Sequence, residues 1–251
     1  MHVKFLGSGD AFGSGGRYNA CFLLEATKRR YLIDCGASSM IALRKFHIDP
    51  NTIDAIFVSH FDIDHFGGAP LLAMEGHLLG NRTLPLAIAG PVGLRHRFYQ
   101  WIDLSLPSRL ISRQLRYELN LIELAPEHGE VEIAGVRVTP FPVNHFGSDV
   151  GAPPLALRLQ TNGRVLAYTG DTDWVVSLVP CGRGADLLIA EAWHYRSDYR
   201  FHLDFVTLEQ HLHEIGAKRV IVTHMNEDMI ERAKNNSLGI EAAEDGKVVN
   251  L

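Results

Sequence analysis

Two histidines and two aspartates are concentrated in one short stretch, at positions His60, Asp62, Asp64 and His65. An apolar run leads into them and two glycines follow. Imidazole nitrogens and carboxylate oxygens are common ligands of divalent metals such as zinc, iron and manganese. Successive side chains of a strand point to opposite faces, so four such groups converge only if a loop carries them. The stretch therefore predicts part of a metal site, on a loop between a buried strand and a helix.

Further residues of the same kinds follow strand-like apolar runs later in the chain. The runs over 136–142, 165–168, 186–190 and 220–222 lead to His145, Asp171, Glu191 and His224. Ligand-type residues that follow strand after strand are expected to share one rim of a sheet, where a reactive centre is commonly built. The other histidines at positions 47, 77, 96 and 128 lack this placement and are interpreted as surface or hydrogen-bonded residues.

The elements that must position these residues alternate between strands and helices. Strands are expected over 3–6, 20–25, 31–34, 54–58, 84–89, 119–124, 129–133, 136–142, 155–159, 165–168, 186–190 and 220–222. Helices are expected over 40–46, 68–79, 93–104 and 205–215, with Pro91 at the start of the third. No repeat, low-complexity tract or linker interrupts this alternation, so we expect a single domain over residues 1–251.

Composition narrows the class of protein. The chain has 251 residues, 46% of them hydrophobic, and a net charge of -5, which argues against a protein that coats nucleic acid. Its three cysteines have no CxxC spacing, so we interpret them as reduced core residues. The amino terminus lacks a long apolar segment and no run reaches the length of a membrane span, so we expect a cytoplasmic protein without a membrane partner.

One segment has the opposite charge. Between Arg82 and Arg116 the only acid is Asp103, whereas the arginines are Arg82, Arg95, Arg97, Arg109, Arg113 and Arg116. The segment is either a solvated helix face or a wall that attracts an anionic substrate. The sequence leaves both interpretations open.

The whole pattern resembles the metallo-β-lactamase superfamily, whose motif is His-x-His-x-Asp-His followed by remote His, Asp and His. The segments 5–9, 32–36, 168–172 and 244–246 are similar to the branch that contains ribonuclease Z and the phosphonate-pathway cyclic phosphodiesterase. This resemblance covers nearly the whole chain. It implies an α/β (α+β) fold, a four-layer αββα sandwich in which two mixed β-sheets pack face to face with helices outside.

The resemblance also implies two divalent metal ions. Carried over position by position, the first ion would be held by His60, Asp62 and His145, the second by Asp64, His65 and His224, and Asp171 would lie between them. Two ions about 3.5–4 Å apart can hold a bridging water, lower its pKa toward about 7 and stabilise charge on a phosphoryl group.

Three residues have catalytic roles by the same resemblance. Asp64 would orient or deprotonate the bridging water, and His202, supported by Glu191, would protonate the leaving oxygen. The alternative for Glu191 is to support a ligand histidine. His194 is interpreted as a bystander.

The chain departs from the family motif at Asp62, where the motif has its second histidine. Zinc is the usual metal of the family, and a carboxylate at this position shifts the preference toward manganese or iron while zinc still fits. Flavodiiron proteins of the same superfamily carry an acid, a Glu, at this position and bind iron. The chain has no room for their flavin domain, so a diiron redox role is the less favoured alternative.

The implied activity is hydrolysis of a phosphodiester, with an RNA end or a small cyclic or nucleotide molecule as the anionic substrate. The family also hydrolyses lactones, thioesters and β-lactams on the same centre, so these remain alternatives. A non-catalytic relative that has lost a ligand is disfavoured because Asp62 can still coordinate. Ribonuclease Z grips tRNA with an extended arm, and the sequence has no long Gly/Pro-rich insertion of that kind, which favours a smaller substrate. Dimers are common among the proteins it resembles, and the sequence leaves a homodimer open.

Overall fold

The computed structural model of this chain describes residues 1–105, 115–146 and 153–251. Within these residues the strands form two sheets of seven strands each. In the first sheet, the order is β14 (Val248–Asn250), β1 (His2–Gly7), β2 (Cys21–Ala26), β3 (Arg29–Ile33), β4 (Ala55–Phe57), β5 (Leu86–Pro91) and β6 (Leu119–Leu124). Strands β14, β1, β2 and β3 are antiparallel neighbours, and β3 to β6 are parallel, so this sheet is mixed.

The second sheet is likewise divided into a parallel half and an antiparallel half. Its order is β13 (Glu241–Ala242), β12 (Val220–Thr223), β11 (Leu187–Glu191), β10 (Arg164–Tyr168), β9 (Leu155–Thr161), β8 (Val136–Pro142) and β7 (Val131–Ile133). Strands β13 to β10 are parallel and β10 to β7 are antiparallel. The two sheets therefore repeat one arrangement, in which one half of each sheet is parallel and the other half is antiparallel.

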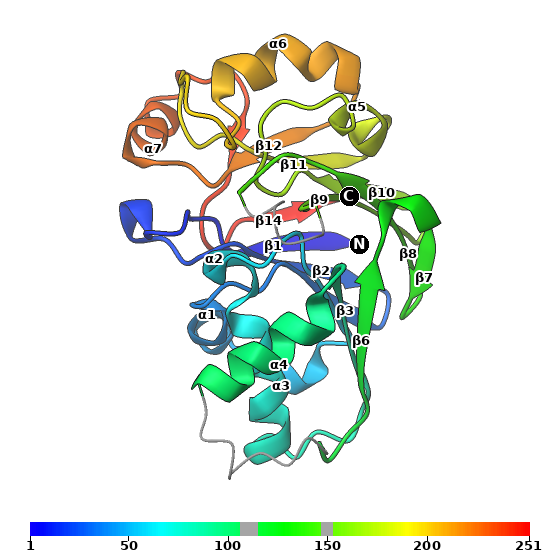
Figure 1. Cartoon of the computed structure of the whole chain (residues 1–251). Coiled ribbons are helices and arrows are strands. Elements are labelled where there is room, and N and C mark those ends of the chain that lie inside the picture. Colours follow the sequence, from blue (N-terminus) through cyan, green and yellow to red (C-terminus); the bar gives the residue numbers. More distant parts are fainter. Residues whose placement is uncertain (106–114, 147–152) are drawn as a thin grey trace.

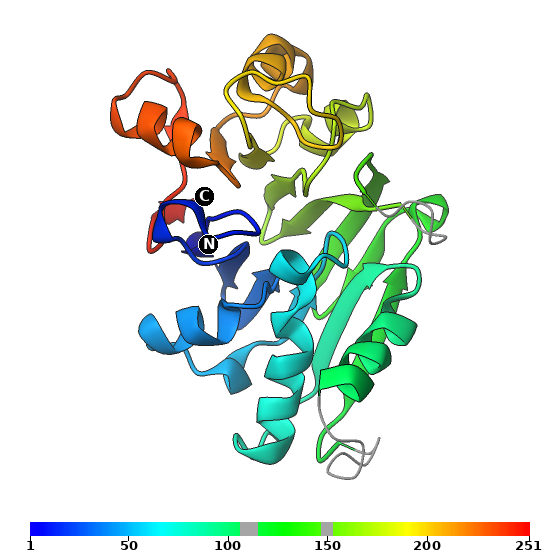
Figure 2. The same ribbon diagram turned by 60° about the vertical axis from the view of Figure 1, so that its left-hand side comes forward.

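Helices cover the outer faces of both sheets (Figure 1). On the first sheet lie α1 (Ser39–Lys45), α2 (Ile63–Phe66), α3 (Gly68–Leu78) and α4 (Leu94–Ser105), and on the second lie α5 (Leu178–Gly182), α6 (Phe205–Ile215) and α7 (Glu227–Lys234). Short 3-10 turns occur at Ser14–Gly16, Pro50–Thr52 and Pro126–His128. Figure 2 shows the same layers from a second direction.

Apolar side chains divide into three layers that match this architecture. Residues of both sheets, such as Phe5, Phe57 and Leu157, form one buried cluster between the sheets. Two further clusters lie between each sheet and its helices. Burial on both faces explains why the central strands read as nearly continuous apolar runs. The predicted αββα sandwich of two mixed sheets is confirmed.

Several local predictions were wrong or incomplete. Pro91 ends strand β5 rather than beginning a helix, and α4 begins at Leu94. The ligand-rich stretch is only partly a loop, because Asp64 and His65 lie on the short helix α2. Helices α5 and α7 and strands β13 and β14 were not predicted.

The cysteines follow the prediction: Cys21, Cys35 and Cys181 are buried and unpaired. Among the described residues, no helix is both long enough and apolar enough to cross a membrane.

Candidate functional site

Strand ends from both sheets meet at one rim. Ser59 and His60 follow β4, and His145 follows β8. Asp171 lies three residues beyond β10, and His224 is the first residue after β12. Strands β10, β11 and β12 are parallel neighbours, so the groups at their carboxyl ends are brought together by the sheet itself.

Two glycines allow the ligand-rich stretch to approach strand β3. A side chain at Gly36 would place its Cβ 2.0 Å from the backbone oxygen of Asp64, and one at Gly68 would place it 2.3 Å from the backbone oxygen of Gly36. The close approach is fixed by backbone hydrogen bonds, because the amide of Cys35 donates to the carbonyl of His65 at 2.7 Å. Only glycine tolerates such contacts, so these positions hold Asp64 and His65 against the rim.

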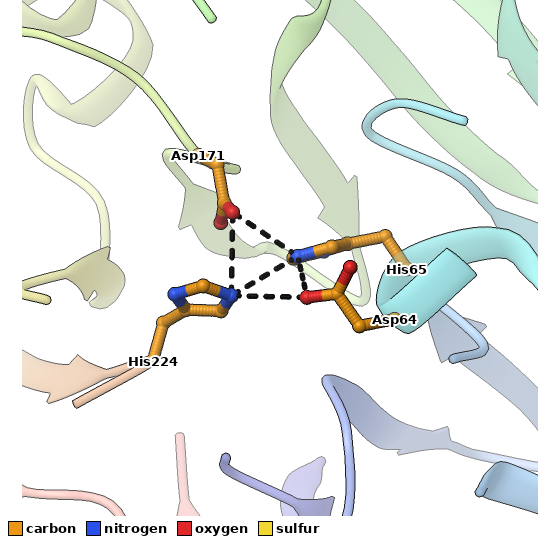
Figure 3. Close-up of side chains that lie close together, drawn as sticks. All are labelled: Asp64, His65, Asp171 and His224. Carbon is orange, nitrogen blue, oxygen red and sulfur yellow. Dashed lines mark hydrogen bonds and ion pairs between the residues drawn. The ribbon is translucent and has the colours of Figure 1, made fainter. Parts of the chain in front are cut away.

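Four side chains converge most tightly, namely Asp64, His65, Asp171 and His224 (Figure 3). Nε2 of His65 lies 3.1 Å from Oδ2 of Asp64 and 3.3 Å from Oδ2 of Asp171. Nε2 of His224 lies 3.2 Å from each of the same two oxygens. The two Nε2 atoms are 3.3 Å apart. All four side chains are buried.

The nitrogen and oxygen atoms of these four side chains are arranged as ligands of a cation would be. Nδ1 of His65 donates to Oδ2 of Asp34 at 2.7 Å, so its Nε2 faces the other three groups and can offer them a lone pair when the ring is neutral. Two imidazole nitrogens and two carboxylate oxygens directed at one point repel one another unless positive charge lies between them. A divalent metal with nitrogen and oxygen ligands satisfies this arrangement.

A second group shares Asp171 and comprises His60 and His145. Nδ1 of His145 donates to the carbonyl of Phe201 at 2.7 Å, which leaves its Nε2 facing the site. Among the described residues, His60 Nε2 and Asp171 Oδ1 are buried without a hydrogen-bond partner. Buried polar atoms normally have partners, so these orphans fit a second metal.

Asp62 lies at the edge of this second group. Its Oδ2 atom is 3.3 Å from Nε2 of His145 and 3.7 Å from Nε2 of His60. The Asp62 side chain is 50% exposed, whereas the side chains of the six other predicted ligands are at most 5% exposed. The structure thus brings all seven predicted ligands to one rim, with Asp62 on the solvent side.

The pKa shifts of the buried histidines and carboxylates indicate that the site attracts positive charge. Burial, together with the nearby His65, lowers the pKa of His60 to about 4, so its imidazole is neutral near pH 7. Burial also opposes protonation of His224, but Asp171 and Asp64 outweigh it and raise its pKa to about 9. Burial opposes ionisation of Asp171, yet His224 and His65 hold its pKa well below the usual value. The carboxylates are therefore ionised and attract positive charge, which either protons or a metal can supply.

Glu191 and His202 form a buried pair beside the ligands. Glu191 ends β11 and is fully buried, and it accepts a hydrogen bond from Nδ1 of His202. Its other oxygen accepts from the amide of Thr172 at 2.8 Å. Nδ1 of His224, a predicted ligand, lies 3.6 Å from Oε1 of Glu191, beyond hydrogen-bond distance. Of the two predicted roles for Glu191, the geometry favours support of His202.

The predicted bystander lies outside this group. Nδ1 of His194 is 2.6 Å from the side-chain nitrogen of Asn226. His194 does not line the cavity around the ligands.

A cavity of about 200 Å³ opens over the ligands and is named here the metal-site cavity. Asp64, Asp171, His202 and His224 are on its floor and walls, and its rim is aromatic. The rim side chains are Phe12, Phe146, Trp193 and Tyr199. Aromatic faces stack on planar groups such as nucleobases. No lysine or arginine lines this cavity within the described part of the chain.

Sequence reasoning missed the support for His65. Asp34 is fully buried at the end of β3, where its carboxylate accepts from Nδ1 of His65 and from the amide and hydroxyl of Ser59. Two signals were available: Asp34, like the predicted ligands, comes at the end of a strand, and it lies in the segment 32–36 that resembles the family. The rim aromatics were also missed, because isolated aromatic residues are usually part of a core.

The arginines of the basic segment have different surroundings in the structure. Arg82 is buried, and its guanidinium donates to backbone carbonyls that include those of Ile53 and Pro85. Arg95 contacts the carbonyl of Leu121, and Arg116 contacts the side chain of Asn81. Arg97 lines a cavity beside the site. Arg109 and Arg113 lie outside the described residues.

Comparisons with known proteins agree with this geometry. The family model described as "Beta-lactamase superfamily domain" matches residues 29–225. Ribonuclease Z of Lachnoclostridium phytofermentans is 23% identical over 307 residues, which cover 100% of this chain and 98% of that protein. The alignment is longer than the 251 residues of this chain, so that relative carries insertions that this chain lacks.

Two solved structures share the fold. The metallo-beta-lactamase fold protein YhfI from Bacillus subtilis superposes with a TM-score of 0.79 at 19% identity, covering 99% of each chain. Human tRNase Z, short form, superposes with a TM-score of 0.78 at 25% identity, covering 100% of this chain and 99% of that one.

Proposed function

The chain belongs to the beta-lactamase superfamily and is a metal-dependent hydrolase, and we propose that it cleaves phosphodiester bonds of nucleotide-containing substrates on a two-metal centre. The observation that carries this proposal is the meeting of seven ligand-type side chains at one rim, beside a cavity that His202 also lines and with Glu191 bonded to His202. The similarity to ribonuclease Z and to tRNase Z supports phosphodiesters over other esters.

Two ligand groups would hold the metals. His60, Asp62 and His145 form one, Asp64, His65 and His224 form the other, and Asp171 belongs to both. Divalent ions held there polarise a phosphoryl oxygen and lower the pKa of water. The donor set of imidazoles and carboxylates suits zinc, and the extra carboxylate of Asp62 makes manganese or iron suitable as well.

The chain's own residues complete the chemistry. The Asp64 carboxylate is ionised and faces the cavity, where it can orient an attacking water and accept its proton. His202 lines the same cavity and is oriented through Nδ1 by Glu191, so its Nε2 is placed to give a proton to the leaving oxygen. Asp34 fixes the ring of His65.

The cavity favours a small or terminal substrate. Its volume of about 200 Å³ accommodates a phosphodiester with one flanking group, not a folded RNA. The aromatic rim offers faces for a base. We therefore propose a nucleotide or an oligonucleotide end as the substrate.

A substrate panel tests this function. Protein loaded separately with zinc, manganese or iron is assayed with bis(p-nitrophenyl) phosphate, p-nitrophenyl acetate and a simple lactone. We expect the phosphodiester to have a kcat/KM at least about tenfold above the other two. Hydrolysis of the lactone or the carboxylic ester in preference to the phosphodiester would refute the proposal, and oxygen consumption without hydrolysis would favour a redox role.

A further inference from the structure

A second cavity, of about 310 Å³, adjoins the metal-site cavity, and it is named here the side cavity. Asp62 and Phe146 line both cavities, so the two meet at these residues. The metal ligand His60 also lines the side cavity. A molecule bound over the predicted ligands can therefore extend into the side cavity.

One cationic side chain of the described part of the chain, that of Arg97, lines the side cavity. Helix α4 contributes His96, Arg97 and Gln100, and Arg97 is half-buried there. Among the described residues, the Arg97 guanidinium has neither an ion pair nor a side-chain hydrogen bond. The neighbouring Arg95 is exposed, contacts the carbonyl of Leu121 and does not line the cavity. Arg97 is thus the described arginine of the basic segment that faces the site with its donors free.

The remaining walls are apolar or aromatic. Phe61, Val92, Phe146 and Pro154 line them. Phe146 is 45% exposed at the border between the cavities. Such walls suit a sugar or a base, and the volume is at the small end of ligand pockets, about 300–1,000 Å³. The space is therefore suited to one nucleotide unit.

We infer that Arg97 binds a second phosphate of the substrate, so that the chain prefers nucleotides carrying one phosphate at the metal ligands and another in the side cavity. A planar guanidinium binds phosphate oxygens with two parallel hydrogen bonds, a geometry that lysine and glutamine do not reproduce. The Asp62 carboxylate at the border is a predicted metal ligand, so a bound metal offsets its repulsion of this phosphate. This inference rests on the proposed phosphodiesterase function and names its substrate class.

Two substrates that differ only in the second phosphate test the inference. They are thymidine 5′-(p-nitrophenyl phosphate) and its 3′-phosphorylated form. We expect the native enzyme to have a kcat/KM about tenfold higher for the second, the lower range of a charge-assisted hydrogen bond because Arg97 is partly exposed. Arg97→Gln is expected to remove this preference, and Arg97→Lys to retain part of it.

Arg95→Gln is the matched control, because it removes the same charge from the same helix outside the cavity. It should keep the preference within about twofold. An unchanged preference in Arg97→Gln, an equal loss in Arg95→Gln, or no preference in the native enzyme would overturn the inference. Thermal melting of each variant reports on folding.

A binding assay separates this inference from the proposed function. Titration calorimetry compares thymidine 3′,5′-bisphosphate with thymidine 5′-monophosphate on the native protein and the Arg97→Gln variant. If neither p-nitrophenyl ester is hydrolysed, the phosphodiesterase proposal fails, and the calorimetric preference alone decides the inference. Tighter binding of the bisphosphate that is lost in Arg97→Gln supports it, and equal affinities refute it.

Discussion

Asp171→Ala is expected to abolish both hydrolysis and metal retention. Asp171 is the one side chain that belongs to both groups of ligands, with Oδ2 at 3.2 Å from His224 and 3.3 Å from His65. Its removal takes a negative charge from a buried cluster of imidazoles, and each metal loses a ligand. The measurement is the metal content after dialysis, together with kcat/KM on bis(p-nitrophenyl) phosphate, which should fall to the uncatalysed background.

Asp198→Ala controls for the loss of a carboxylate near the site. Asp198 is exposed and belongs to neither ligand group. This variant should retain its metals and at least about half of the parent rate. An Asp171→Ala protein that keeps two metals and full activity would show that Asp171 does not bridge the centre.

His202→Ala is expected to keep the metals and lose turnover in a way that depends on the leaving group. A general acid contributes about 10²–10⁴-fold to rate, and its contribution is largest when the leaving oxygen is a poor leaving group. For a dinucleotide such as thymidylyl-thymidine, whose leaving group is an alcohol, kcat should fall within this range. For a p-nitrophenyl ester, whose leaving group needs little protonation, kcat should fall less than about tenfold.

This comparison separates proton donation from a structural role, because a structural defect would slow both substrates equally. His194→Ala is the matched control, since His194 lies in the same segment but outside the metal-site cavity. It should change kcat less than about threefold on either substrate. Equal losses on both substrates in His202→Ala would remove the proposed acid role.

The candidate ligands that the structure brings to one rim could be predicted from sequence because each one follows an apolar run. Parallel strands place their carboxyl ends at one edge, so a repeated position along the chain translates into one position in space. The sandwich itself came from the family resemblance, because alternating strands and helices are compatible with several folds. Helix α7 could also have been found, since Asn226 caps it and acids and bases occupy its first and last turns.

Other features depend on contacts that no local pattern records. The role of Asp34 arises from the parallel pairing of β3 with β4, which places Ile33 opposite Phe57 and brings Ser59 and His65 to the carboxylate. Arg82 and Arg97 look alike in the basic segment. The fold buries the first among carbonyls and turns the second into a cavity, a difference that only tertiary structure determines.

The most direct test of a two-metal phosphodiesterase is a titration of metal-stripped protein with zinc, manganese or iron. Hydrolysis of bis(p-nitrophenyl) phosphate is followed against metal equivalents per chain. We predict that activity is absent in stripped protein, rises with added metal and reaches its plateau at about two equivalents. Full activity in stripped protein, or a plateau at one equivalent, would contradict the two-metal centre.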